Sequence, residues 1–218
     1  MASVIAEVGG AAPEMLRFLW SLPQKRNFTG KSPPLFMEHR RSLRGDCAAC
    51  QGLCCVGLAF DRSEWFGFDK PCDVPCPHLE PTNRCAIHAQ LPAAGQAGCA
   101  SYDCYGAGQR VSQALFAGAS WRDDPRRARA MFSAFRRLKE VHELRWLLHE
   151  AGGLPLQPAH EAERARLLGL LEPEPELSAQ ALDALDLETL GVEAHRLLRS
   201  LRGYVAGEPP RRRLPLRP

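Results

Sequence analysis

The sequence has no run of roughly 18 or more apolar residues, the length that a membrane-spanning helix needs. Residues 1–10 contain neither Lys nor Arg, and Gly9, Gly10 and Pro13 interrupt the apolar stretch there. The basic and apolar regions of a secretory signal are therefore both missing. These absences predict a cytoplasmic protein with no membrane partner, whose thiols stay reduced unless they bind a metal.

The chain also has little net charge. Its 218 residues include 28 Lys and Arg against 25 Asp and Glu, a formal charge of +3. Nucleic-acid binding would need positive charge to be concentrated locally. Residues 47–110 instead hold four basic and six acidic side chains, a net charge of −2, which argues against a nucleic-acid partner. The 45% hydrophobic and 24% charged content excludes collagen-like, fibrous and wholly disordered classes.

Cysteine is absent from residues 1–46 and 105–218, yet nine cysteines lie between Cys47 and Cys104. This segment is rich in Gly and Pro and has few periodic apolar runs, so it has little means of burying apolar surface. A bound metal would organise such a segment. A reducing compartment favours metal ligands over the alternative of a disulfide scaffold, and an odd count leaves at least one thiol outside complete pairing.

If Cys72 is set aside, eight thiols form an ordered series that begins with a Cys-x-x-Cys pair, a spacing that brings two thiolates to one soft cation. Sulfur-only ligands select zinc, an iron–sulfur cluster or copper(I). Eight thiols fit two four-cysteine sites, or one iron–sulfur cluster with a second site, and spacing leaves this choice open. His78 gives the alternative of a mixed Cys/His site. The candidate ligands are Cys47, Cys50, Cys54, Cys55, Cys76, Cys85, Cys99 and Cys104.

The order of these residues resembles a known family. Cys-x2-Cys-x3-Cys-Cys is followed by Cys-Pro-x-Leu at residues 76–79 and by Arg-Cys-x-Ile at residues 84–87. Over about residues 46–105 the chain is similar to the cysteine-cluster proteins described as zinc- or iron-chelating domains (YkgJ-like). The resemblance implies the same eight cysteines as ligands, and zinc or an iron–sulfur cluster as cofactor. In some members it also implies a link to methyltransfer or other modifying activity. Cys72 stands outside the family order, which favours a free or accessory thiol, and His88 replaces an aromatic residue.

Residues 102–109, 121–125 and 142–146 extend the match, and resemble the N-terminal region of bacterial pentapeptide-repeat-containing proteins. No five-residue period follows, so the chain is similar to that region without the repeats. Gly106-Ala-Gly108 lacks the third glycine and the preceding strand of a dinucleotide fingerprint, and is interpreted as a glycine-rich joint.

From residue 111 onward the pattern is helical. Asp123 and Asp124 before Pro125 indicate a helix start, an apolar stripe continues to about residue 150, and Gly152-Gly153 indicate its end. Shorter helices are expected at about 158–172, 178–190 and 191–205, the second capped by Ser178. The predicted fold is mostly α, with a small loop-rich, metal-organised cysteine module packed on a helical body.

The sequence is divided into four parts: an N-terminal helix and basic lead-in at 1–45, a cysteine-cluster metal-binding module at 46–110, a helical region at 111–205 and a disordered basic tail at 206–218. The predicted function is metal binding by the cysteine cluster, with the helical region as a surface for a protein partner. The alternative is an iron–sulfur or metal-dependent redox or modifying enzyme. No Ser-His-Asp triad or carboxylate pair can be assembled, so enzymatic activity stays open.

Overall fold

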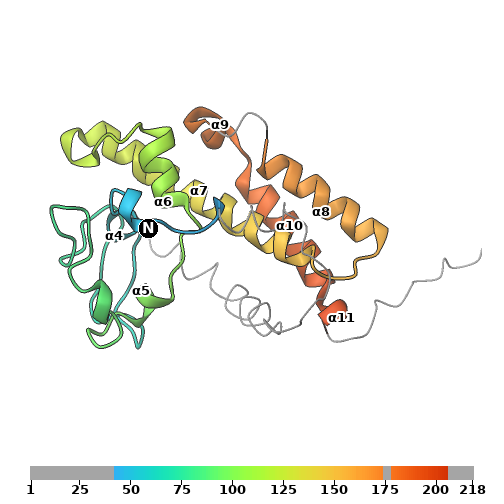
Figure 1. The fold of residues 1–218 in the computed structure, drawn as a ribbon, viewed down its shortest axis with the longest axis horizontal. Helices are drawn as coiled ribbons and strands as arrows, with labels where there is room; N and C mark the ends of the chain where they lie inside the picture. Colours follow the sequence, from blue (N-terminus) through green and yellow to red (C-terminus); the bar gives the residue numbers. More distant parts are fainter. Residues whose placement is uncertain (1–41, 174–177, 206–218) are drawn as a thin grey trace, which may run out of the picture.

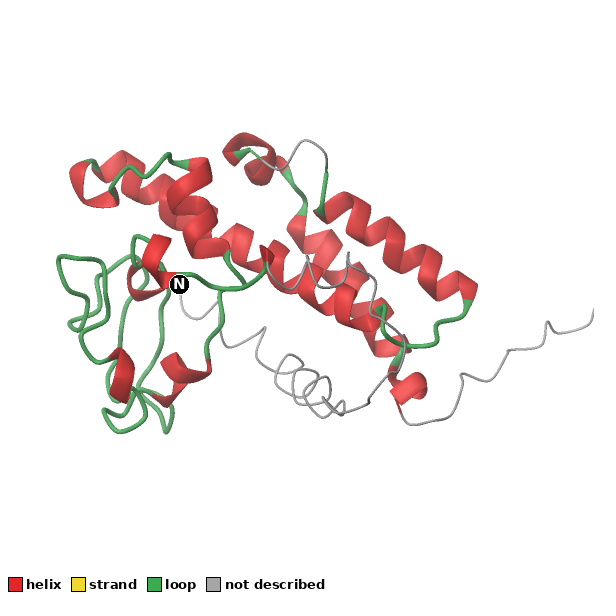
Figure 2. Ribbon diagram, viewed as in Figure 1, coloured by secondary structure: helices red, strands yellow, loops and turns green. Residues whose placement is uncertain are grey.

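The computed structural model describes residues 42–173 and 178–205. Within those ranges the chain is mostly helical and contains no β-strand, which confirms the mostly α prediction (Figure 2). The expected N-terminal helix, most of the basic lead-in, the basic tail and residues 174–177 of the acidic linker lie outside the described residues. Within the described ranges, no helix is both long enough and apolar enough to cross a membrane.

A single long helix, α7 (Pro125–Ala151), runs through the molecule. It begins where the sequence predicted, because the Asp124 side chain accepts a 2.8 Å hydrogen bond from the backbone amide of Arg126 and Pro125 occupies the first turn. It ends at Gly152, also as predicted. The predicted apolar stripe is its buried face, which includes Met131, Phe135, Leu138, Val141, Leu144 and Leu148.

Helices α8 (Pro158–Leu171) and α10 (Leu187–Ser200) pack along the C-terminal half of α7, as Figure 1 shows. Short helices α9 (Ala179–Ala184) and α11 (Arg202–Val205) flank α10 along the chain. Arg137 of α7 connects α7 to the C-terminal end of α9 by donating hydrogen bonds to the carbonyl oxygens of Leu182 and Leu185 at 2.9 and 2.6 Å. The fully buried side chains here include Leu167, Leu171, Leu182 and Ala194.

The boundary predicted between the last two helices, at residues 190 and 191, is wrong. The helical structure is interrupted earlier, at Leu185 and Asp186. The Asp186 carboxylate accepts a 3.1 Å hydrogen bond from the amide of Thr189 and so caps the start of α10. Ser178 does cap α9 as predicted, accepting from the amide of Ala181 at 3.1 Å.

The cysteine-rich segment lies at the N-terminal end of α7 and consists mainly of loops (Figures 1 and 2). Its regular elements are short: η1 (Cys47–Ala49), α4 (Cys54–Gly57), η2 (His88–Gln90) and α5 (Ala97–Ser101). It leads into α6 (Ala107–Arg110), the π-helical turn η3 (Val111–Leu115) and η4 (Trp121–Asp123).

This segment packs on the helical body, as predicted. Leu53 and Val56, both fully buried, join α4 to the core formed by α7, where Phe132 and Phe135 lie. The indole Nε1 of Trp121 donates a 2.9 Å hydrogen bond to a backbone carbonyl of the cysteine-rich segment, that of Gln51. The sequence pattern therefore placed the module correctly, although its organisation by a metal stays a prediction.

Candidate metal centre

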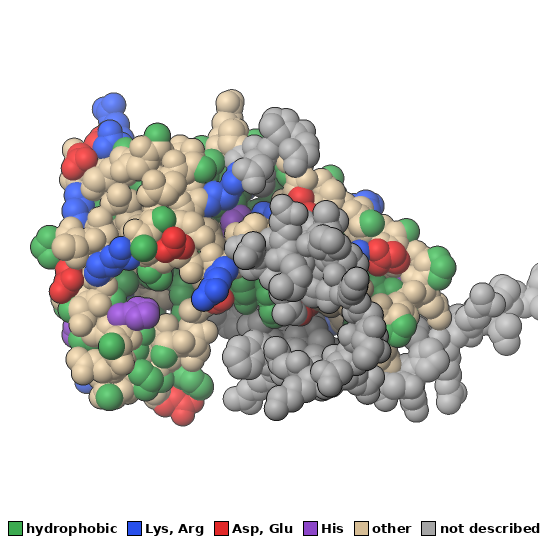
Figure 3. Space-filling model, in the orientation of Figure 1, with side chains coloured by type: hydrophobic (Ala, Val, Ile, Leu, Met, Phe, Trp, Pro, Cys, Tyr) green, Lys and Arg blue, Asp and Glu red, His purple; other side chains and the backbone are tan. Residues whose placement is uncertain are grey.

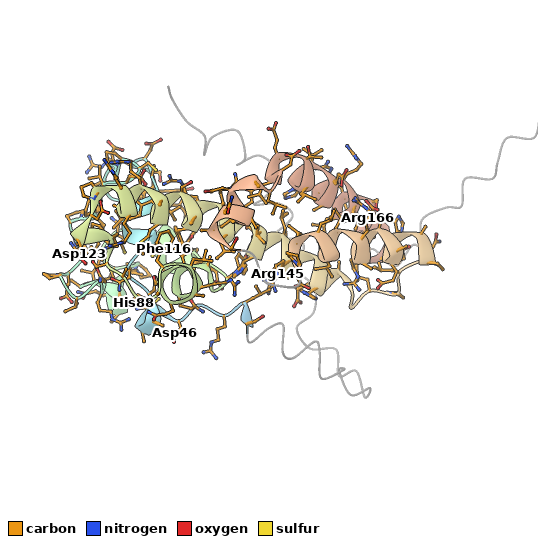
Figure 4. All side chains as sticks on the ribbon, turned by 90° about the horizontal axis from the view of Figure 1, so that it is seen from above. Asp46, His88, Phe116, Asp123, Arg145 and Arg166 are labelled. Carbon is orange, nitrogen blue, oxygen red and sulfur yellow. The ribbon has the colours of Figure 1, made fainter. Side chains whose placement is uncertain are left out.

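All nine cysteines are free thiols, with no disulfide among them. Cys47 and Cys72 are exposed, and the other seven are partly buried. They occupy one end of the molecule: Figure 4 shows Asp46, next to Cys47, and His88, three residues after Cys85, together there, while Arg145 and Arg166 lie on the helical body.

The first cysteine element is a tight turn around Cys50. The Asp46 carboxylate caps η1 by accepting a 2.8 Å hydrogen bond from the amide of Ala48. Burial raises the pKa of the Cys50 thiol, and the backbone amides of Leu53 and Gly52 act in the opposite direction. Gly52 has a φ of +69°, in the left-handed region that favours glycine, so the backbone can turn back toward the Cys50 thiol. Amide donors to a cysteine sulfur stabilise a thiolate and orient it as a metal ligand.

The adjacent cysteines Cys54 and Cys55 open α4 with their sulfurs 4.0 Å apart. The hydrogen bond with Cys55, followed by burial, raises the pKa of the Cys54 thiol well above its ordinary value. Two thiols this close cannot both ionise easily unless a cation lies beside them.

The second element, around Cys76 and Cys85, is a short antiparallel turn. The amide of Cys76 donates to the carbonyl oxygen of Cys55 at 2.8 Å, and the Cys76 sulfur accepts a hydrogen bond from the backbone of His78. Cys85 returns opposite Leu79 through an isolated antiparallel bridge. The backbone of Cys76 is thereby held beside that of Cys55, and Cys85 lies opposite Leu79.

Cys104 forms the third element, at the start of α6. Its sulfur accepts hydrogen bonds from the backbones of Gly106 and Gly108. A β-carbon added to Gly108 would lie 2.7 Å from the sulfur of Cys50 and 3.8 Å from that of Cys104. The glycine-rich joint predicted from the sequence is therefore also the place where the first and third elements meet.

Burial is the main influence on these thiols. It raises the pKa of both Cys50 and Cys99 to about 11, with neighbouring cysteines adding to the shift. Burial likewise raises the pKa of Cys47, Cys76 and Cys104. Because only the thiolate is a metal ligand, these protonated thiols would have to release protons for a metal ion to bind them.

Two basic side chains stabilise the loops around the thiols. Lys70 is 3% exposed, and its Nζ donates to the carbonyl oxygens of Val56 at 2.9 Å, Pro71 at 3.2 Å and Leu58. The Arg84 guanidinium donates to the carbonyl oxygens of Cys47 and Ala48. Each thus brings a positive charge to a group of thiols.

The Tyr102 hydroxyl is inaccessible to solvent and has no hydrogen-bond partner among the described residues. Burial, followed by negative charge on Cys54 and Cys104, raises the pKa of its phenol. These two cysteines therefore act on the phenol more strongly than any other charged group does. A buried hydroxyl without a partner costs free energy, and a thiolate sulfur is an acceptor that would satisfy it. This orphaned donor fits a metal-thiolate site.

Cys72 and His78 have contacts of their own. Cys72 contacts Arg136, which lies 3.2 Å from its sulfur and 2.6 Å from the Asp73 carboxylate. The His78 ring packs edge-on against Phe68 with ring centroids 5.8 Å apart. The eight candidate cysteines offer sulfur donors, which would suit zinc or an iron–sulfur cluster.

Among the described residues, no three His, Cys, Asp or Glu side chains already converge as a metal-binding group. Among the predicted cysteines, the structure places the sulfurs of Cys54 and Cys55 4.0 Å apart and those of Cys50 and Cys104 beside the same residue, Gly108. Residues that sequence reasoning missed are Lys70, Arg84 and Tyr102. The one available signal was that Lys70 is the single lysine among residues 47–110.

The surface expected to bind a protein partner carries few apolar side chains. On the described helices α8 and α10, the large apolar residues that are exposed are Leu170 and Val192, at 45% and 51%. Such isolated side chains are ordinary for a protein surface. On the face drawn in Figure 3, acidic and basic side chains are interspersed around the cysteine-rich end.

The comparisons with known proteins give one relative. No protein-family model and no solved structure matches the chain. The chain is 38% identical over 154 residues to the uncharacterized protein YybG of Bacillus subtilis (strain 168), an alignment that covers 71% of this chain and 53% of that protein. The chain thus spans about half the length of the relative it matches, whose name assigns no activity.

Proposed function

We propose that this protein binds a metal, zinc or an iron–sulfur cluster, through the thiolates of its cysteine cluster. The observation that carries the proposal is that thiols lie side by side within and between loops: the Cys54 and Cys55 sulfurs are 4.0 Å apart, and the Cys50 and Cys104 sulfurs both lie within 4 Å of the β-carbon position of Gly108. Backbone amides that act to lower the pKa of Cys50, Cys76 and Cys104 support it further, because such donors favour thiolate ligands. We also propose the relationship to the cysteine-cluster (YkgJ-like) proteins, on the residue order given above.

The residues of this chain divide the work of such a site. The cysteines would supply the ligands and the backbone amides would orient them, while the Tyr102 hydroxyl, which has no partner among the described residues, would gain a thiolate as acceptor. Lys70 and Arg84 offset part of the negative charge of the ionised thiols. When bound, zinc would supply structural cross-linking of the loops, and an iron–sulfur cluster would supply electron transfer.

Metal analysis of anaerobically purified protein, combined with an optical spectrum, tests this proposal. Stoichiometric zinc in a colourless protein, or iron and sulfide in a brown one, supports it and identifies the metal. Protein without either metal and with mapped disulfides contradicts it.

Single substitutions test the ligands. Cys50→Ser and Cys85→Ser are expected to lower metal content, whereas the matched control Cys72→Ser keeps it, because Cys72 contacts Arg136. The helices α7 to α10 should stay folded in all three variants, as measured by circular dichroism at 222 nm. Unchanged metal content in Cys50→Ser and Cys85→Ser would exclude these residues as ligands.

A further inference from the structure

The sulfurs of Cys50 and Cys104 lie beside the same residue, Gly108, although the two cysteines are 54 positions apart in the chain. The β-carbon position of Gly108 is 2.7 Å from the Cys50 sulfur and 3.8 Å from the Cys104 sulfur. The two sulfurs are therefore no farther apart than the sum of these distances. Because Gly108 has no side chain, nothing from this position of α6 enters the space beside them.

The backbone of the first cysteine element is bound to the helical segment that follows the third. The amide of Gln51 donates a 3.0 Å hydrogen bond to the hydroxyl oxygen of Ser112. The side-chain amide of Gln113 donates to the carbonyl oxygen of Ala49 at 2.8 Å. These two bonds lie on either side of the first element's buried thiol along the chain. The fold, rather than closeness in the sequence, therefore keeps the two thiols together.

Cys54 and Cys55 also have adjacent sulfurs, 4.0 Å apart, but their backbone is less suited to a disulfide. Consecutive Cα atoms lie about 3.8 Å apart across a trans peptide bond, below the roughly 4.4–6.8 Å that a disulfide usually spans. Both residues are also helical, at the start of α4. Cys50 and Cys104 belong to separate segments, which frees them from this restriction, and both are partly exposed, so a small oxidant can reach them.

We propose that Cys50 and Cys104 are a redox pair, which closes to a disulfide in the metal-free protein with a small disulfide, such as oxidised glutathione, as the oxidant. One cysteine thiolate attacks a glutathione sulfur, so that the glutathione S–S bond breaks, a mixed disulfide forms and one glutathione leaves. The other cysteine attacks the protein sulfur of the mixed disulfide and displaces the second glutathione. Two electrons pass from the cysteines to the oxidant, and the two protons that the cysteines lose end on the two glutathione thiols.

The redox pair would regulate the proposed metal site, and this consequence rests on the proposed metal-binding function. The disulfide removes two of the eight candidate ligands, because only a thiolate binds the metal. Metal binding and the disulfide therefore exclude each other. A bound metal protects the two thiols from oxidation, and oxidation of the metal-free chain lowers its affinity for metal until a reductant opens the disulfide.

The pair is tested by incubating the reduced, metal-free full chain with glutathione buffers of increasing oxidised fraction. The pH is mildly alkaline, because burial raises the pKa of both thiols and only the thiolate attacks. Fragment mass spectrometry of the non-reduced protein assigns each disulfide. We expect Cys50–Cys104 to be the main link in the folded chain. In urea this selectivity should be lost, because an unfolded chain closes short loops more easily than long ones. A folded chain in which other cysteine pairs form first overturns the proposal.

Single variants trap the intermediate. Cys50→Ser should accumulate a mixed disulfide of glutathione with Cys104, and Cys104→Ser one with Cys50, because the second attacking thiol is missing. The control Cys72→Ser should form the Cys50–Cys104 link as the unchanged chain does. Circular dichroism at 222 nm checks that the helices of each variant are folded. A folded Cys50→Ser chain that links Cys104 to another cysteine as readily as the unchanged chain forms its own link overturns the pairing.

Treating the anaerobically purified protein with the same oxidant separates this inference from the proposed function. Where metal is bound, we expect it to prevent the link, and we expect the oxidised metal-free chain to lose metal binding until dithiothreitol restores it. A chain that forms the link but contains and binds no metal overturns the proposed function and leaves the redox pair in place. A metal-binding chain that does not form the link when metal-free overturns the redox pair alone. A link that forms without loss of bound metal overturns the regulation.

Discussion

The backbone amide of Cys76 donates a 2.8 Å hydrogen bond to the carbonyl oxygen of Cys55, and so joins two residues that are 21 positions apart. The Lys70 ammonium donates to two carbonyl oxygens just after Cys55, those of Val56 and Leu58. In addition to the single turn of α4, a backbone donor and a buried ammonium therefore hold the chain around and after Cys55. Buried carbonyls need such donors.

Replacing Lys70 with Met should therefore destabilise the cysteine-rich end. The change leaves buried carbonyls without a donor, at about 1–3 kcal/mol for each unsatisfied group. It also removes the cation on which charge from Cys76, Cys72 and Cys55 acts, so affinity for the proposed metal should fall. Urea unfolding and cobalt titration measure the two effects. Arg129→Met, which removes one positive charge from an exposed position of α7, should change both by little.

Gly108→Ala should weaken the proposed metal binding at Cys50 and Cys104 although alanine favours helices. The new β-carbon would lie 2.7 Å from the Cys50 sulfur, closer than such contacts occur, so the thiol must move. At Gly169 in α8, by contrast, nothing lies within 4 Å of the added carbon. Gly169→Ala is expected to stabilise the protein by up to about 1 kcal/mol. Thermal unfolding and metal content should separate the two variants, and equal metal content in both would contradict the packing argument.

Local signals predicted the helical part of this fold well. Asp124 with Pro125, Ser178 and Gly152 each act through neighbouring backbone groups, and the structure confirms all three. Asp186 carries the same type of signal, and the predicted boundary at residues 190 and 191 does not take it into account.

The surroundings of the thiols were not predictable in this way. The orphaned hydroxyl of Tyr102 and the contacts of Arg84 with Cys47 and Ala48 depend on how distant loops meet, since 36 and 37 residues separate the partners of Arg84 from it. The spacing of the cysteines indicates candidate ligands, because that spacing is local in the sequence. It does not indicate which side chains surround them, because those side chains come from distant segments of the chain.

Tyr102→Phe should affect the metal-bound protein more than the metal-free one. In the metal-free protein the change removes a buried hydroxyl that has no partner among the described residues, so the free energy of unfolding should stay the same or rise by up to about 1 kcal/mol. In the metal-bound protein it removes a hydrogen-bond donor from the neighbourhood of Cys54 and Cys104, so metal affinity should fall. Cobalt titration and urea unfolding test both statements.

The control for this change is Tyr204→Phe on α11. The Tyr204 hydroxyl has two partners, the amide of Gln157 at 3.0 Å and the Nδ1 of His160 at 2.8 Å. Its removal should cost about 1 kcal/mol of stability and leave metal affinity unchanged. The opposite pattern, with metal affinity lost in Tyr204→Phe and kept in Tyr102→Phe, would count against the role given to the orphaned hydroxyl.

The helical body should show a separate dependence on pH through Glu172. Its carboxylate lies 2.8 Å from Arg145 Nε and 2.7 Å from His149 Nε2. Burial alone would raise its pKa, but these two hydrogen bonds outweigh burial and lower the pKa from 4.5 to about 2. Because the folded pKa is lower than the unfolded one, the stabilisation is present above pH 4.5 and disappears as pH falls toward 2.

Glu172→Gln should therefore lose about 1–3 kcal/mol of stability at pH 7, and its difference from the unchanged chain should shrink below pH 4.5. Urea unfolding of metal-free protein at several pH values measures this, with the exposed Glu188→Gln as control. A difference that stays constant from pH 7 to pH 2 would show that the ion pair is not its source.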